Sequence, residues 1–220
     1  MQLTTEKLKS LILEVLNEAA AGIDDIKYKT SIGIGPEVQK HAHITVKDRG
    51  GVIDIYYSDK DGRELSRNTG LYGRVRIMKI SEWKWADEHP CNNAMVIRWS
   101  QAKKGFGPLL YDVAIEVATK IAGGLTSDRK SVSDDAYKIW DYYLNKRSDV
   151  IDNQMDNEKS NLTPKIKTDD CLQKAAVLHS RLKGGTWESS PISKIYSKES
   201  VTLQKLKSLG RLILDVDISF

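Results

Sequence analysis

Residues 94–118, which decide the fold, read AMVIRWSQAKKGFGPLLYDVAIEVA. The first seven are mostly apolar and β-branched, which predicts a strand. A turn with two glycines follows at 101–107, and Pro108 then stands where a first helical residue is favoured. Apolar residues recur after it with the 3.6-residue period of a helix, at positions 109, 110, 113, 114, 117 and 121. The stretch therefore predicts a strand, a glycine turn and a helix in direct succession.

Three further strand-like runs precede this stretch. They are rich in β-branched and aromatic residues and occupy positions 41–47, 52–58 and 74–80. Turn residues separate the first two at 48–51, and an Asp- and Gly-containing turn follows the second at 58–62. The spacing predicts an antiparallel meander that leads into the strand at 94–100.

A second strand and helix follow the first pair. Gly123 and Gly124 close the first helix, and residues 125–127 are long enough for a short parallel strand. Ser133, followed by two aspartates, is a typical helix cap and predicts a helix after it. The chain thus predicts a βαβα unit built onto a meander.

The two ends of the chain add elements to this unit. An amphipathic helix is predicted at 5–20, and the polar stretch 149–169 reads as a loop or linker. Helices at 171–182 and 203–209 and an alternating strand at 212–220 are expected beyond it. We therefore predict an α/β fold with a mixed, mostly antiparallel sheet, in three parts: an N-terminal helix (1–22), a central domain (23–148) and a C-terminal extension (149–220).

Composition excludes several classes of protein. The formal charge is +4 on 64 charged residues that are scattered by sign, which argues against a nucleic-acid partner. No run of 18 apolar residues occurs, so no membrane-spanning segment is expected. Two cysteines, Cys91 and Cys171, are too few for a disulfide framework and favour a reducing compartment such as the cytoplasm. They also match no zinc spacing, so we expect no metal.

The glycine turn carries the clearest sign of function. It is neither a Rossmann fingerprint nor a Walker A loop, yet glycines before a helix N-terminus suit a phosphate group. The turn, the strand before it and the helix after it resemble those of the Gcn5-related N-acetyltransferase family, whose loop has the pattern Gln/Arg-x-x-Gly-x-Gly/Ala. Gly105 and Gly107 match the two small positions, whereas Gln101 matches the first position only with a shift of one residue.

This resemblance implies acetyl-CoA as the cofactor. The diphosphate would lie on the amides of the turn, and the pantetheine arm would pair with the backbone of the preceding strand, which splays from the strand at 125–127. The residues implied in binding are Ile97, Arg98, Trp99, Lys103, Lys104, Gly105, Phe106, Gly107 and Pro108. Ser127 and Ser133 are candidates for a polar contact with the arm, although a turn serine and a helix cap are the simpler interpretations.

The catalytic residues are harder to assign. Family members often have a tyrosine that acts as the general acid at the position where this chain has Trp140. Tyr143 is the substitute that lies nearby, although it also suits a core position. Glu82 is a candidate base, with Asp87, Glu88 and His89 as rivals in the same segment. Six aromatic residues fit either an acceptor pocket or, more readily, the core: Tyr56, Tyr57, Tyr72, Trp83, Trp85 and Trp99.

The N-terminal helix suggests a location. Leu16, Asn17 and Glu18, followed by Ala19, are similar to the cleavage site of tailed-phage prohead proteases, which remove a targeting peptide from internal head proteins. This likeness implies a phage-encoded protein that works in the host cytoplasm after being packaged in the head. The acceptor would then be an amine of a host protein or of a small molecule.

Two other functions remain open. Trp140 at the usual tyrosine position is compatible with a catalytically degenerate member that binds a protein partner through its C-terminal extension. The other is an internal head protein that contacts packaged DNA, and the small net charge of the chain argues against it.

Overall fold

The computed structural model describes residues 42–67, 70–79, 94–103, 106–157, 161–166, 169–171 and 185–218. Its strands are β1 (His43–Asp48), β2 (Val52–Ser58), β3 (Ser66–Arg67), β4 (Gly70–Leu71), β5 (Gly73–Lys79), β6 (Met95–Ala102), β7 (Leu125–Thr126), β8 (Val150–Gln154), β9 (Lys194–Lys198) and β10 (Leu212–Asp215). Its helices are α3 (Gly107–Ala122), α4 (Asp134–Lys146), the short 3-10 helix η3 (Pro191–Ser193) and α6 (Val201–Ser208).

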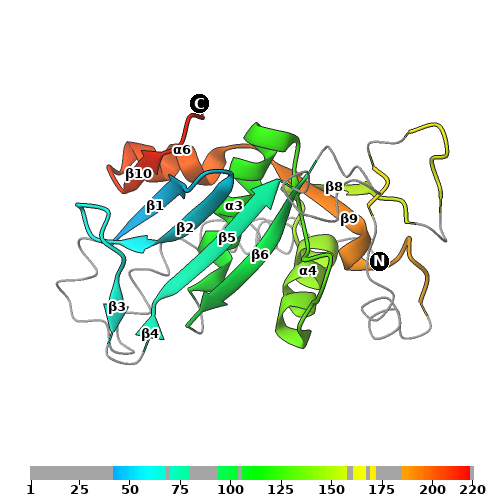
Figure 1. Ribbon diagram of the computed structural model, residues 1–220, viewed down its shortest axis with the longest axis horizontal. Coiled ribbons are helices and arrows are strands. Elements are labelled where there is room, and N and C mark those ends of the chain that lie inside the picture. The colour runs from blue at the N-terminus through cyan, green and yellow to red at the C-terminus, as the bar shows by residue number, and fades with distance from the viewer. Residues whose placement is uncertain are drawn as a thin grey trace, which may run out of the picture.

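One mixed sheet organises these elements (Figure 1). Its strand order is β10-β1-β2-β5-β6-β7-β9-β8, and β3 and β4 form a separate pair. The predicted antiparallel meander is confirmed in β1, β2, β5 and β6, and β7 lies parallel to β6. The α/β class and the mostly antiparallel sheet are therefore confirmed.

Helix α3 packs on one face of the sheet and forms the main core with it. Every second residue of the central strands points at this helix, among them Ile55, Val75 and Ile77. The helix is buried from Leu109 through Ala118, because α6 contacts it as well as the strands of the sheet, β9 among them. A helix enclosed on all sides has no solvent face, so even its acidic residues lie inside.

The C-terminal region differs from the predicted linker and extension. Residues 150–154 form β8, and β9 inserts between β7 and β8, so this region completes the sheet. A second apolar cluster covers part of the opposite face of the sheet: Met78, Ala94, Val96, Met155, Cys171 and Ile195. Strand β8 was missed because its middle residues are polar and exposed, as suits the edge of a sheet.

Cys171 also differs from expectation, because it is disulfide-bonded and almost fully buried. The only other cysteine of the chain is Cys91, which lies outside the described residues. Sequence spacing could not predict the bond, since pairing requires Cα atoms about 4.4–6.8 Å apart in the folded chain.

Several predicted features fall outside the described residues. These are the helix at 5–20 with its Glu18–Ala19 bond, the helix predicted at 171–182 except for its first residue, and the candidate bases from Glu82 to His89. Within the ranges given above, no helix is long and apolar enough to cross a membrane.

Gly124 provides a test of the junction between α3, β7 and β9. A Cβ atom there would lie 2.4 Å from Cγ2 of Ile195 and 2.8 Å from the carbonyl oxygen of Tyr196. Since a backbone atom cannot move aside cheaply, we expect Gly124→Ala to lower the free energy of unfolding by about 1–3 kcal/mol. Urea denaturation measures this, with Gly107→Ala as the control, because the nearest described neighbour of its Cβ would be Ala102, at 3.8 Å. Equal stability of the two variants would contradict the packing described here.

Candidate functional site

The site is built around the end of β6, where this strand leaves its parallel neighbour. Met95 pairs with Leu125 and Val96 with Thr126, after which β7 ends. Strand β6 continues to Ala102, paired on its other side with β5. Among the described strands, none pairs with β6 on its β7 side beyond Val96, so backbone donors and acceptors line an open edge there.

A bulge in β6 lies beside this open edge. Arg76 of β5 pairs with Trp99, whereas Ile77 pairs with Ile97, so Arg98 is the extra residue. A bulge bends its strand and redirects side chains. Here Ile97 is buried, and Arg98 and Trp99 are both exposed.

Helix α3 starts where the chain leaves β6. Its N-cap is Phe106, no side chain in the described part of the chain caps it, and no acidic residue stands in its first turn. The helix begins at Gly107, with Pro108 next, as the sequence predicted to within one residue. Amides left without a cap, at the positive end of the helix dipole, suit an anionic group.

Aromatic side chains hold the turn between β6 and α3. The Tyr57 hydroxyl donates to the carbonyl of Phe106 at 3.0 Å, and the rings of Tyr57 and Tyr72 contact the Phe106 ring. The ammonium of Lys103 lies 4.8 Å from the centre of the Tyr72 ring. Lys104 and Gly105 lie outside the described residues, so only part of the predicted turn is seen.

Two serines were candidates for the cofactor arm, and the structure separates them. Ser133 caps α4, because its Oγ accepts a hydrogen bond from the amide of Ala136 at 3.2 Å. Ser127, just after β7, is fully buried, and its Oγ has no hydrogen-bond partner in the part of the chain that is described. A buried hydroxyl without a partner is costly, so Ser127 is the better candidate for a ligand contact.

A polar pair that the sequence did not suggest lies under the open edge. The hydroxyls of Ser100 on β6 and Tyr111 on α3 are 3.0 Å apart. Burial raises the pKa of Tyr111 despite the hydrogen bond with Ser100, so its phenol is protonated at neutral pH. The signal for this pair was a tyrosine on the apolar stripe of the helix, one turn after Gly107.

Tyr143 has a structural position. It is buried, and its hydroxyl donates to Asp112 Oδ1 at 2.8 Å. Burial, with the neighbouring charge of Asp112, raises its pKa well above the ordinary value. Trp140 is also buried, stacked on Tyr196 with ring centres 5.0 Å apart. The proton of Tyr143 is thus committed to Asp112, and its role as an acid in catalysis stays a prediction.

The aromatic residues divide between the core and the surface. Tyr56, Tyr57 and Tyr72 are buried, as the core interpretation predicted. Trp99 is 39% exposed, more than any other aromatic residue in the described ranges. Trp83 and Trp85 lie outside those ranges.

A cluster of arginines surrounds one buried carboxylate on the face of the sheet opposite α3. Asp54 accepts hydrogen bonds from Arg76 Nε at 2.6 Å and from Arg49 Nε at 2.8 Å, and Arg74 lies 3.8 Å away. Burial alone would raise the pKa of Asp54, but the hydrogen bond from Arg76 and the charges of Arg74 and Arg76 outweigh it and lower the pKa. Arg74 also pairs with Glu64.

This carboxylate yields a pH-dependent prediction. Because the pKa of Asp54 is lowered in the folded state, its charge stabilises the fold above about pH 4, and the contribution is lost as pH falls through the lowered pKa. We expect Asp54→Asn to lower the free energy of unfolding by about 1–3 kcal/mol at pH 7 and by progressively less below pH 3.8. Denaturation of both proteins across pH 7 to 2 measures this; a difference that grows toward low pH would contradict it.

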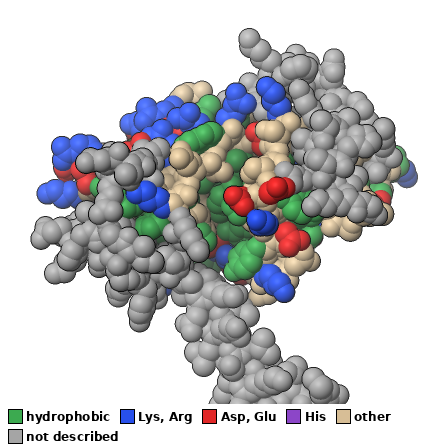
Figure 2. Space-filling view, turned by 90° about the horizontal axis from the view of Figure 1, so that it is seen from below, with side chains coloured by type: hydrophobic (Ala, Val, Ile, Leu, Met, Phe, Trp, Pro, Cys, Tyr) green, Lys and Arg blue, Asp and Glu red, His purple; other side chains and the backbone are tan. Residues whose placement is uncertain are grey.

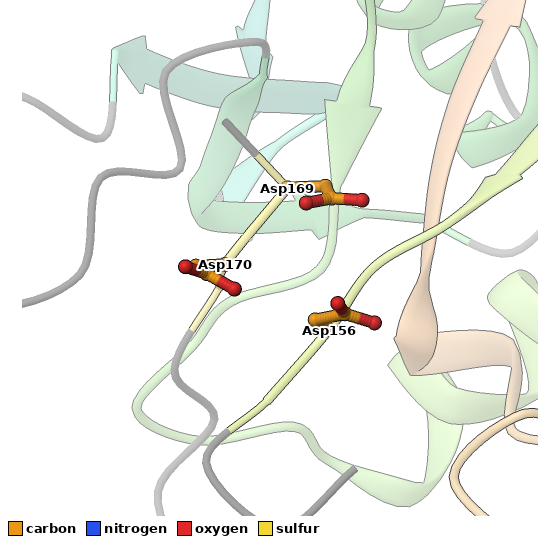
Figure 3. A group of neighbouring side chains, drawn as sticks. All are labelled: Asp156, Asp169 and Asp170. Carbon is orange, nitrogen blue, oxygen red and sulfur yellow. The ribbon is translucent and has the colours of Figure 1, made fainter. Parts of the chain in front are cut away.

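Three carboxylates, Asp156, Asp169 and Asp170, lie close together (Figure 3), with oxygens within 4.8 Å of one another. Asp156 is buried and accepts from the amides of Leu162 and Thr163, each at 2.8 Å, and from the Thr163 hydroxyl. These bonds give Asp156 a role in shaping its own loop, and the expectation of no metal stays a prediction.

Seen from the side toward which β6 runs, the surface carries a mixture of side-chain types (Figure 2). Hydrophobic side chains lie at its centre, next to a group of Asp, Glu and basic side chains, and more Lys and Arg side chains gather toward one side.

Comparison of the chain with protein-family models, with curated proteins and with solved structures finds no match.

Proposed function

We propose that this chain is an acetyl-CoA-dependent N-acyltransferase that acts on an amine of a host protein or of a small molecule. The observation that carries the proposal is the open edge of β6, which leads through a glycine-containing turn into the uncapped start of α3. An extended arm with amide groups can pair with such an edge, and a diphosphate can bind such a helix end. One strand and one helix thus offer both halves of coenzyme A a place.

Details of the residues fit this cofactor. A Cβ atom at Gly107 would have no neighbour nearer than 3.8 Å among the described residues, which leaves room for a ligand to approach the backbone there. Lys103 adds positive charge beside the turn, and Ser127 supplies a buried hydroxyl without a partner in the described chain. Ile97, Arg98 and Trp99 contribute the backbone of the bulged edge, and Phe106 and Pro108 flank the start of the helix.

Acetyl transfer to an amine requires few further groups from the protein. The lone pair of the neutral acceptor amine attacks the thioester carbonyl, a C–N bond forms and the C–S bond breaks. The proton that the amine nitrogen loses passes, directly or through a base, to the coenzyme A thiolate, which leaves as the thiol. Unpaired amides of β6 are suited to donate to the carbonyl oxygen as it gains charge. A base must keep the amine neutral, and Glu82 remains our candidate on sequence grounds alone.

Calorimetric titration with acetyl-CoA tests the cofactor. We expect a binding free energy of about −8 kcal/mol, which corresponds to a micromolar dissociation constant. At about 100 times that constant, the cofactor should also stabilise the fold by about 2.7 kcal/mol. Absence of both heat and thermal stabilisation would refute the proposal.

A second candidate is a catalytically degenerate protein that binds a partner. Its support is the position of Tyr143, whose hydroxyl donates to Asp112, together with the buried Trp140. This candidate predicts that acetyl-CoA binds but no amine is acetylated. Release of the coenzyme A thiol in the presence of mixed amines and host extract separates the two.

Packaging in a phage head is a separate proposal that depends on Leu16, Asn17 and Glu18. A purified prohead protease of the same phage should cut between Glu18 and Ala19 and shorten the chain by 18 residues, which mass spectrometry resolves. An intact bond after incubation would refute it without affecting the proposed chemistry.

A further inference from the structure

A row of five side chains crosses the sheet on the face opposite α3. Strand register places them as direct neighbours: Asp215 on β10, Lys47 on β1, Asp54 on β2, Arg76 on β5 and Trp99 on β6. Directly opposed residues share a face of the sheet. The bonds from Lys47 to Asp215 and from Arg76 to Asp54, both 2.6 Å, agree with this placement.

Cationic groups outnumber anionic ones around this row. Among the described residues, the ion pairs around the row join four cations, Lys47, Arg49, Arg74 and Arg76, to three anions, Asp54, Glu64 and Asp215. The side chains of Arg49 and Arg76 are 50% and 38% exposed, whereas Asp54 is fully buried. The negative charge therefore lies beneath the surface, and the positive charge faces outward.

The two exposed guanidiniums also have donors to spare. Arg49 uses only Nε on Asp54, and Arg76 uses Nε and, at 3.4 Å, one terminal nitrogen. A guanidinium carries five N–H donors in a planar fork that matches a carboxylate. Their remaining N–H groups have no hydrogen-bond partner among the described residues.

Trp99 adds a flat apolar surface beside Arg76. The bulge at Arg98 leaves the indole 39% exposed at the same strand that carries the open edge. An exposed large aromatic ring beside a cation suits a ligand that has both an aromatic ring and an anionic group.

We propose that Trp99 and Arg76, with Arg49, bind an aromatic carboxylate, and that this is the part of the acyl acceptor which the protein recognises. The link to an acceptor rests on the proposed function, because Trp99 adjoins the edge of β6 that would hold the cofactor. The binding of the aromatic anion does not depend on that function.

Three small probes test the two halves of the site, by NMR-detected titration of the full chain. They are 3-phenylpropanoate, 3-phenylpropan-1-ol, which lacks the charge, and propanoate, which lacks the ring. We expect 3-phenylpropanoate to bind at least about tenfold more tightly than either of the others. A charge-assisted hydrogen bond accounts for this against the alcohol, and the contact of its ring with Trp99 accounts for it against propanoate. Equal affinities, or no binding of 3-phenylpropanoate, would overturn the inference.

Variants assign the effect to the row. Arg76→Gln should abolish the preference over the alcohol, Arg76→Lys should restore part of it, and Trp99→Leu should abolish the preference over propanoate. Arg63→Gln is the control, because Arg63 is exposed and pairs with Asp59 and Asp61 away from the row. Preferences that stay unchanged in both Arg76→Gln and Trp99→Leu would overturn the assignment. If Arg76→Gln proved unstable, an unchanged preference in Trp99→Leu would overturn it alone.

The same samples, titrated with acetyl-CoA, separate the two proposals. Cofactor binding without the probe preference would refute this inference alone. The probe preference without cofactor binding would refute the acyltransferase and leave a site for an aromatic anion.

Discussion

Asp112→Ala should lower the free energy of unfolding by about 3–5 kcal/mol, the largest stability effect that we expect in this chain. Asp112 lies inside α3 and accepts hydrogen bonds from Arg147, at 3.0 and 3.3 Å, and from Tyr143. Its loss would leave the buried guanidinium of Arg147 with Asp149 as its remaining partner and the Tyr143 hydroxyl without an acceptor. Urea denaturation at pH 7 measures the change.

Two comparisons separate this charge effect from simple truncation. Asp135→Ala, at an exposed position of α4, should change stability by no more than about 0.5–1 kcal/mol. The double variant Asp112→Leu, Arg147→Met removes both charges of the buried pair and should recover most of the loss, because no buried guanidinium is then left with only part of its partners. If the double variant were less stable than Asp112→Ala, the incompletely paired guanidinium would not be the cause.

Gly107→Trp should weaken acetyl-CoA binding by at least about 100-fold, or about 2.7 kcal/mol. The indole would crowd the backbone at the start of α3, where the proposed diphosphate site needs close approach. The fold should tolerate the change, since the nearest described neighbour of a Cβ atom there is Ala102, at 3.8 Å. Calorimetry measures the affinity, and thermal unfolding confirms that the variant folds.

The matched control introduces the same side chain at the other end of the helix. Lys120 is exposed in the last turn of α3, so Lys120→Trp should bind acetyl-CoA as the parent does. Equal loss in both variants would indicate a general effect of added tryptophan. Unchanged affinity in Gly107→Trp would place the cofactor elsewhere or nowhere.

The sequence predicted the secondary structure around the candidate site well. The apolar period of 94–118 and Pro108 located β6 and α3 to within about two residues, and Ser133 was identified as a possible cap. Asp112 and Glu116, two acidic residues within the apolar helix at 109–121, were a signal of buried polar contacts that the sequence analysis left out. The Glu116 carboxylate accepts hydrogen bonds from the backbone amides of Thr202 and Leu203, at the start of α6, and forms an ion pair with Lys198.

Other features of the site had no local signal. Tyr56 and Trp99 both stand in strands on the same face of the sheet, yet Tyr56 is buried and Trp99 is exposed. Tyr56 is covered by groups that only the fold brings to it: the Arg74 guanidinium lies 5.1 Å from its ring centre, and its hydroxyl donates to the carbonyl of Gly62 at 3.2 Å. Likewise, the hydroxyl of Tyr143 meets Asp112 only because α4 packs against α3.

The sequence by itself determined the α/β class, the antiparallel meander and the strand, turn and helix at 94–118, because side-chain periodicity and turn chemistry act between near neighbours. Only the tertiary structure decided that β10 lies on β1, that β9 enters between β7 and β8, that Cys171 is disulfide-bonded and that β6 has an open edge. These features depend on contacts between residues far apart in the chain, whose pairing follows from the packing of the whole core and leaves no pattern in any one segment.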